Sequence, residues 1–143
     1  MRKSDDLKAE YVLIQAQYEA FDQRALSMKA LATPLLGAGI AFGAKEHNDA
    51  MLLATILVAA ALWLLESIWK GFQYCYTDRI IALEAWFRGE GPENLAPFQI
   101  YTEWGKVYVL EKLWYIVSRM WAPFISLPYA IIILAAIFVL PQN

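Results

Sequence analysis

The chain has 143 residues, of which 59% are hydrophobic, and its mean hydropathy is +0.38. This length predicts one compact unit, and the apolar share exceeds the roughly 45–50% that is usual in soluble domains. A formal net charge of -2 gives no reason to expect sequence-specific readout of nucleic acid, one cysteine excludes an internal disulfide, and one histidine excludes a His/Cys metal cluster.

The first predicted element is a polar amphipathic helix that begins near Ser4, with no apolar signal-peptide core before it. Over residues 4–32 its apolar positions step alternately by four and three residues: Leu7, Tyr11, Ile14, Tyr18, Phe21, Ala25, Met28 and Ala32. This 3.5-residue period predicts packing along one seam. Because the seam is aromatic, packing in a helical bundle is favoured over self-association as a zipper. We assign residues 1–27 to a cytoplasmic N-terminal helix.

Residues 28–44 are the first candidate membrane span, although Lys29, Pro34 and three glycines interrupt the apolar run. A re-entrant or surface-lying helix is the alternative. Gly39 and Gly43 form a GxxxG pattern, which allows close approach of helices in lipid. The pattern indicates either an oligomer seam or pore-lining helix that can bend at Pro34, or packing against the second span of the same chain.

Residues 50–69 are the second span, with 20 residues and one formal charge, and they complete a transmembrane hairpin over 28–69. A helix of that length crosses a hydrocarbon core of about 30 Å. We expect this helix to continue without interruption over 50–88. Glu66 can then meet Lys70 one turn away in an interfacial ion pair, and the alternative is a ring of Glu66 side chains at a pore mouth. Glu84 and Arg88 have the same i,i+4 spacing.

Residues 70–121 are predicted to be a cytoplasmic helical region, with a Gly- and Pro-containing turn over 89–99 and a helix over 100–121. Residues 122–140 follow without a charge, so that 122–143 form a third transmembrane helix and an outer C-terminus. Pro123 fits a kink at the membrane surface.

The twelve basic residues are distributed unevenly: five before or at the first span, six within 70–121, and only Lys45 between the first two spans. The positive-inside rule places the N-terminus in the cytoplasm and the C-terminus outside. The predicted fold is an all-α membrane protein with three transmembrane helices and a cytoplasmic helical bundle. Its surplus of cytoplasmic aromatic residues indicates a homo-oligomer.

Two groups of residues are candidates for function, and neither is catalytic, because no nucleophile–base pattern, phosphate loop or metal-ligand spacing is present; no cofactor is expected. The pore or oligomer seam would comprise Thr33, Pro34, Gly37, Gly39, Gly43, Glu66 and Lys70. Contacts with a nucleotide, another anionic signal or a partner would come from Arg79, Arg88, Lys106, Lys112 and Arg119. Interleaved acidic residues favour the alternative for the second group, a solvated face with lipid-headgroup contacts.

The segment Leu62–Gln73 and the following Arg79–Glu84 resemble the span-to-cytoplasm helix of small bacterial defence-associated membrane effectors, SLATT-type proteins and the channel component of Hailong-type systems. The resemblance is architectural and transfers no site residue. It implies a homo-oligomeric channel of the inner membrane, such as a tetramer, gated by a nucleotide-derived signal or its synthase and acting in antiviral defence. The residues leave two alternatives open: a non-conducting anchor that recruits a cytoplasmic partner and, more weakly, a transporter-like subunit.

Overall fold

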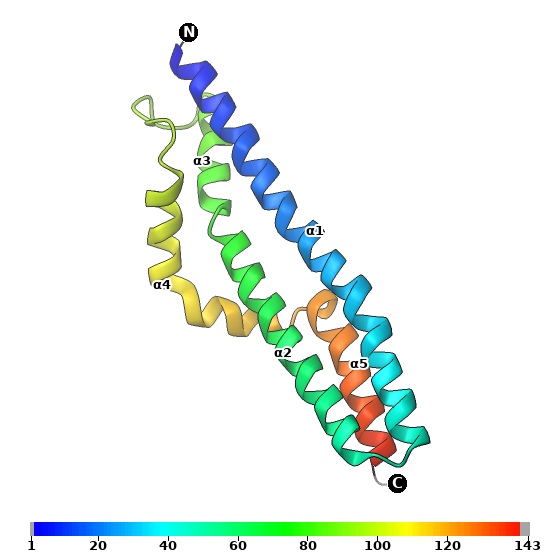
Figure 1. Ribbon diagram of the computed structural model, residues 1–143. Coiled ribbons are helices and arrows are strands. Elements are labelled where there is room, and N and C mark those ends of the chain that lie inside the picture. Colours follow the sequence, from blue (N-terminus) through cyan, green and yellow to red (C-terminus); the bar gives the residue numbers. More distant parts are fainter. Residues whose placement is uncertain (1, 141–143) are drawn as a thin grey trace.

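The computed structural model describes residues 2–140, with side chains throughout that range except at 2, 109–113 and 115. Over these residues the chain is all-helical and contains no strand (Figure 1). The helices, in chain order, are α1 (Arg2–Lys45), α2 (Asp49–Tyr74), α3 (Thr77–Phe87), α4 (Ile100–Met120) and α5 (Pro123–Val139). The all-α prediction is therefore confirmed.

Helix α1 joins the predicted cytoplasmic helix and the first candidate span into one element of 44 residues. At 1.5 Å per residue it is about 66 Å long, and it forms the long edge of the molecule in Figure 1. Pro34 lies inside the helix, where its missing N–H removes one backbone hydrogen bond without ending the element. Residues 28–44 do not turn back on themselves, as a re-entrant loop would.

A tight turn after Lys45 reverses the chain into α2, and two local features fix it. His47 adopts a left-handed backbone with φ of 49°, and the Asn48 side chain caps α2 by accepting a hydrogen bond from the Met51 N–H at 3.0 Å. Helix α5 lies beside the turn-proximal halves of α1 and α2 (Figure 1). A small core of Leu36, Ala59 and Ile132 joins these three helices.

The predicted continuous helix over 50–88 is wrong, because α2 ends at Tyr74 and α3 begins at Thr77. The Tyr76 N–H bonds back only three residues, to Gln73 O at 3.2 Å, which tightens the chain into a turn. The Cys75 thiol also donates to Gly71 O at 3.3 Å, next to the Cys75 N–H at 3.4 Å. Two donors therefore share one carbonyl at the break.

The N-terminal half of α1 packs on α3 through the predicted seam. Leu7 and Ile14 of α1 form a buried cluster with Ile80 and Leu83 of α3. Tyr11 and Tyr18 from the same seam pack against this cluster, together with partly buried apolar residues at its edge: Tyr76, Trp86, Leu95 and Ile100. The seam is thus the core-facing side of an amphipathic helix.

Helix α4 changes direction within its length, so that its C-terminal half crosses α2 at a steep angle (Figure 1). The Trp63 indole N–H of α2 donates to Met120 O at 2.8 Å, and its ring lies edge-on to Trp121. Ala122 is extended and Pro123 occupies the first turn of a new helix, α5. Pro123 therefore starts a helix rather than kinking a continuous one.

Within residues 2–140, two helices are long and apolar enough to cross a membrane: α1, and α2 taken together with α3. Only 11% and 28% of their most apolar windows are buried, whereas the core helix of a soluble protein would be mostly buried. The third expected span, α5, is apolar but has 17 residues rather than the 19 expected. The structure thus gives two candidate spans and a shorter apolar helix beside them.

Candidate functional site: the charged junction and the small-residue faces

Four charged side chains from α1 and α2 meet at one level, where α5 begins; we call this group the charged junction, and it consists of Asp22, Lys29, Glu66 and Lys70. Lys29 Nζ lies 2.7 Å from Glu66 Oε1 and also donates to Phe124 O at 2.7 Å. The Glu66 side chain is 1% exposed and that of Lys29 is 20% exposed. One lysine therefore ties α1 to both α2 and α5.

The other half of the charged junction is a network around Lys70. Its ammonium group pairs with Asp22 and donates to Gln73 Oε1 at 2.8 Å. The Gln73 amide in turn donates to Tyr18 O at 2.9 Å and to Asp22 Oδ2 at 3.0 Å. Gln73 is 3% exposed, so burial makes each of these bonds costly to lose. The network fixes the register between α1 and α2.

Both predicted i,i+4 ion pairs are wrong. Glu66 pairs with Lys29 and Lys70 with Asp22, across the helix interface rather than along α2. Glu84 accepts a hydrogen bond from the Tyr11 hydroxyl at 3.0 Å, and Arg88 pairs with Glu90. Spacing along one helix makes a pair geometrically accessible, but a partner on the neighbouring helix is better shielded from water.

Glu66 faces the inside of a single chain. Its carboxylate lies between α1 and α5, within interaction range of the buried Tyr129 hydroxyl. A ring of carboxylates at a pore mouth requires side chains that face an axis between copies, and a side chain that is 1% exposed in the protomer does not. Of the two interpretations, the geometry is that of the ion pair, with Lys29 as partner.

The GxxxG glycines, Gly39 and Gly43, are used within the chain. A Cβ at Gly39 would collide with the Thr55 hydroxyl of α2, and one at Gly43 would lie 2.7 Å from Leu52 Cδ2. Both glycines thus allow α1 to approach α2 closely. Packing against the second helix of the same chain is the interpretation that the structure supports.

A second group of small residues on α1 points away from the protomer. Thr33, Pro34, Gly37 and Ala41 are all exposed, and a Cβ added at Gly37 would meet nothing within 4 Å. Positions 33, 37 and 41 repeat every four residues and so follow one face of the helix. We call these three the outer small face.

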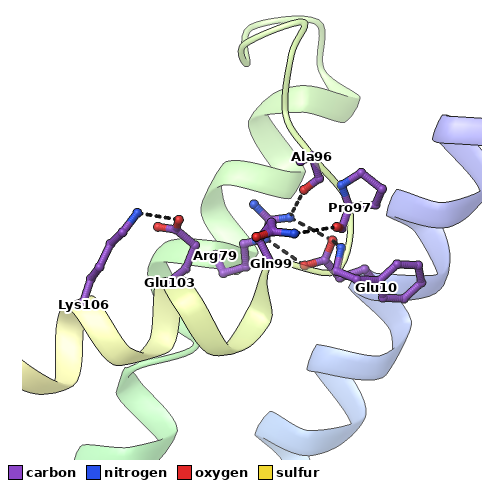
Figure 2. Close-up of polar contacts among 8 residues, drawn as sticks. Glu10, Arg79, Ala96, Pro97, Gln99, Glu103 and Lys106 are labelled. Atoms are coloured by element: carbon purple, nitrogen blue, oxygen red, sulfur yellow. Dashed lines mark hydrogen bonds and ion pairs between the residues drawn. The ribbon is translucent and has the colours of Figure 1, made fainter.

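Arg79, predicted as a ligand or partner contact, lies inside the protein: its side chain is 4% exposed, and its guanidinium pairs with internal partners (Figure 2). Its Nε and Nη2 donate to the two Glu10 carboxylate oxygens at 2.8 and 2.9 Å. Nη2 also donates to Ala96 O at 2.7 Å, and the Phe98 N–H donates to Glu10 Oε2 at 2.8 Å. The pair fastens the α3–α4 loop to α1.

The remaining basic candidates do not gather into one site. Arg88 and Lys106 are exposed and pair with Glu90 and Glu103 respectively. The Lys112 side chain lies outside the part that the structure describes. Arg119 approaches the charged junction, in a cavity that Lys70 also lines.

Sequence reasoning missed three anchoring residues: Glu10, Asp22 and Lys29. Each is adjacent to a seam residue, and Asp22 and Lys29 are seven residues apart, at the same heptad position. Charges that recur beside an apolar seam are therefore the signal that could have identified them.

Among the described residues, no group of His, Cys, Asp or Glu could hold a metal ion. Comparisons with protein-family models, curated proteins and solved structures give no match for this chain. The arrangement must therefore be interpreted from its own geometry. It offers buried ion pairs, close helix contacts and an exposed face of small residues.

Proposed function

We propose that the chain is an integral membrane protein whose copies assemble through the outer small face of α1 and enclose a gated ion-conducting pore. The observation that carries the proposal is the exposure of Gly37 and its neighbours on a long apolar helix. In lipid, close approach of helix backbones replaces the hydrophobic effect as the source of association, and small residues permit it.

Membrane insertion is supported by the exposed surface of the apolar helices. Large side chains cover it on all three: Leu31 and Leu35 of α1, Leu57 of α2, and Ile131 and Phe138 of α5 are each at least 64% exposed. In water, so large an apolar surface would drive aggregation, whereas in a bilayer it faces acyl chains.

The charged junction also supports insertion in a membrane. Its four ionisable groups form two opposite-charge pairs at one level, and the steeply crossing half of α4 lies near that level (Figure 1). Paired charges and a transverse helix with exposed Trp114 and Trp121 are typical of the interface between water and lipid. The distribution of basic residues favours a cytoplasmic N-terminal end, by the positive-inside rule.

A pore bounded by the outer small face would have the Thr33 hydroxyl as its polar group, and its other lining residues would be Gly37 and Ala41. Such a lining forms a hydrophobic constriction that closes by dewetting. The proposed channel is therefore closed at rest and opens on a signal. Its role as an antiviral effector, its inner-membrane location, a nucleotide-derived trigger and a tetrameric state stay predictions drawn from the resemblance.

A non-conducting anchor is the second candidate function, and the extra-membrane end of the molecule favours it. Phe87, Phe98 and Tyr101 are 45%, 53% and 84% exposed there. Exposed aromatic side chains of this kind can dock a cytoplasmic partner. The anchor predicts stable capture of such a partner and no conductance.

The first test is the mass of the purified protein in mild detergent and in nanodiscs, for the wild type and for two leucine variants. Gly37→Leu fills the outer small face, whereas Ala60→Leu adds the same side chain to an exposed position of α2. We expect a defined wild-type oligomer that Gly37→Leu dissociates and Ala60→Leu does not. A monomeric wild type, or equal behaviour of the two variants, refutes assembly through this face.

Recording in planar bilayers on the same samples separates the two functions. Unitary currents from the wild type that are lost in Gly37→Leu support the channel. A defined oligomer that stays silent and retains a native partner supports the anchor.

A further inference from the structure

Three helices carry uncharged runs of almost equal length, and each run is short for a membrane span. The runs are residues 30–44 of α1, residues 50–65 of α2 and the whole of α5, with 15, 16 and 17 residues. At 1.5 Å per residue they are about 23, 24 and 26 Å long. A typical hydrocarbon core is about 30 Å thick, so none of the runs would fill it.

The charged junction sets the three runs to a common level at one end. Lys29, which precedes the run of α1, pairs with Glu66, which follows the run of α2, at 2.7 Å. Lys29 also donates to Phe124 O, in the first turn of α5. The core that the three helices share lies seven, seven and eight residues further into the runs, at Leu36, Ala59 and Ile132. The helices are therefore in register from the charged junction to this core.

The turn between α1 and α2 bounds the runs at the other end. The Lys45 and Glu46 side chains are 75% and 64% exposed there, and α2 begins at Asp49. The last turn of α5 lies beside this turn (Figure 1). Exposed charges are costly in hydrocarbon, so the turn marks a boundary with headgroups or water.

The charged junction marks the opposite boundary. Arg24 of α1 is exposed five residues before Lys29, so a thicker hydrocarbon layer would cover its charge. The steeply crossing half of α4 lies near the charged junction, and its Trp114 and Trp121 are 80% and 69% exposed (Figure 1). Exposed tryptophan rings of this kind are typical of the level where lipid headgroups begin. The layer between the two boundaries therefore has the thickness of one run.

We infer that the apolar belt formed by the three runs fits a bilayer with a hydrocarbon layer of about 25 Å, which α1, α2 and α5 all cross. The inference depends on the membrane insertion proposed above, but not on oligomerisation or conductance. It makes α5 a full span, because 17 residues are too few for a core of about 30 Å but match both neighbouring runs. A thicker bilayer would have to thin around the protein, at a cost in free energy that grows with the mismatch.

The test compares thermal unfolding of the full chain in nanodiscs of phosphatidylcholine whose monounsaturated acyl chains have fourteen, eighteen or twenty-two carbons. Shorter acyl chains give a thinner hydrocarbon layer. We expect the wild type to have its highest unfolding midpoint in the fourteen-carbon lipid. The midpoint should be lower by about 5 °C or more in the twenty-two-carbon lipid, because mismatch costs free energy with every ångström.

The variant Lys29→Met/Glu66→Leu removes the ion pair that bounds two of the runs. Its uncharged runs in α1 and α2 lengthen to 20 residues each, or about 30 Å. Its highest midpoint should therefore shift to the eighteen-carbon lipid. The matched control, Glu10→Leu/Arg79→Met, removes a buried ion pair outside the three runs and should keep the wild-type optimum.

A wild-type midpoint that is highest at eighteen carbons or more, or that does not depend on acyl-chain length, overturns the inference. A common optimum of the wild type and Lys29→Met/Glu66→Leu also overturns it, and the wild-type series decides alone if that variant does not fold. Resistance of the protein to alkaline extraction from membranes is measured in parallel. Extraction refutes the proposed function itself, whereas an inserted protein that is most stable in a thicker bilayer refutes only the thin layer.

Discussion

Removing Arg79 should release the α3–α4 loop from α1, because this side chain neutralises a carboxylate that has no access to water. Glu10 is 0% exposed and accepts hydrogen bonds from Arg79 and from the Phe98 N–H. Phe98 has φ of 58°, a left-handed conformation that a bulky residue adopts only when its surroundings enforce it. In Arg79→Met the apolar stem is kept while the charge and its donors are lost.

The expected cost follows from this burial. Breaking a buried pair by removing one partner costs about 3–5 kcal/mol, since the other charge stays desolvated. Both side chains are at most 4% exposed, so solvent screening does not reduce the figure. Replacing both residues, in Glu10→Leu/Arg79→Met, removes the stranded charge. The double variant should therefore be more stable than Arg79→Met, although Ala96 O and the Phe98 N–H still lose their partners.

Hydrogen exchange of the Phe98 amide in nanodisc-embedded protein measures the effect locally. A loss of about 3 kcal/mol accelerates exchange roughly a hundredfold in Arg79→Met, because 1.4 kcal/mol corresponds to a factor of ten. Arg88→Met, at an exposed pair, is the control and should leave this amide unchanged. Acceleration of less than about threefold, or a double variant worse than the single one, would refute the reasoning.

Three further predictions concern the helix contacts and one partly buried phenol, that of Tyr76. Gly39→Leu should destabilise the α1–α2 hairpin by at least about 2 kcal/mol, because the new side chain collides with Thr55. The measurement is the midpoint of thermal unfolding in detergent, which should fall. An unchanged midpoint contradicts the close contact. Lys29→Met should lower the free energy of unfolding by about 3–5 kcal/mol, because it leaves the buried Glu66 carboxylate without its partner. The double variant Lys29→Met/Glu66→Leu should recover part of this loss. No recovery in the same unfolding assay contradicts the pairing. Burial raises the pKa of Tyr76 above 10.0, and the neighbouring Cys75 adds to this shift while Arg24 opposes it. The neutral phenol therefore stabilises the fold below pH 10, and this stabilisation is lost as the pH rises through the folded-state pKa. Tyr76→Phe should abolish the alkaline loss of stability, which is measured by phenolate absorbance and helix content.

Helix positions and the seam of α1 could be predicted from the sequence because both depend on local periodicity. Leu7 and Ile14 are 0% exposed, as a 3.5-residue repeat of apolar positions requires. The start of α4 at Ile100 and the apolar helix after Ala122 were also found, since Gly and Pro punctuate the chain on either side.

The break between α2 and α3 could not be predicted in this way. Residues 70–88 contain no proline and only one glycine, so no local signal separates Tyr74 from Thr77. The turn is stabilised instead by the packing of Ile80 and Leu83 on α1. A contact between residues more than sixty positions apart leaves no trace in a local pattern.

Which charged side chains pair with each other also depends on the packing of the helices. Glu66 lies at i,i+4 spacing to Lys70, yet it pairs with Lys29, and Arg79 looked available for a ligand although Glu10 occupies it. An isolated helix offers only its own neighbours, whereas the folded chain brings α1 against α2 and α3 and excludes water between them.

By itself the sequence determined that this protein is helical and which residues of α1 face its core. It also predicted three apolar membrane spans, whereas two of the described helices are long and apolar enough to cross a membrane. Those properties follow from side-chain periodicity and hydropathy along one helix, which are local quantities. Only the tertiary structure decided that Gly39 and Gly43 serve the hairpin while Gly37 stays exposed, and that Lys70 and Arg119 share a cavity. Glycines on one helix look equivalent until a neighbouring helix covers one face, and cations on separate helices meet only when those helices pack.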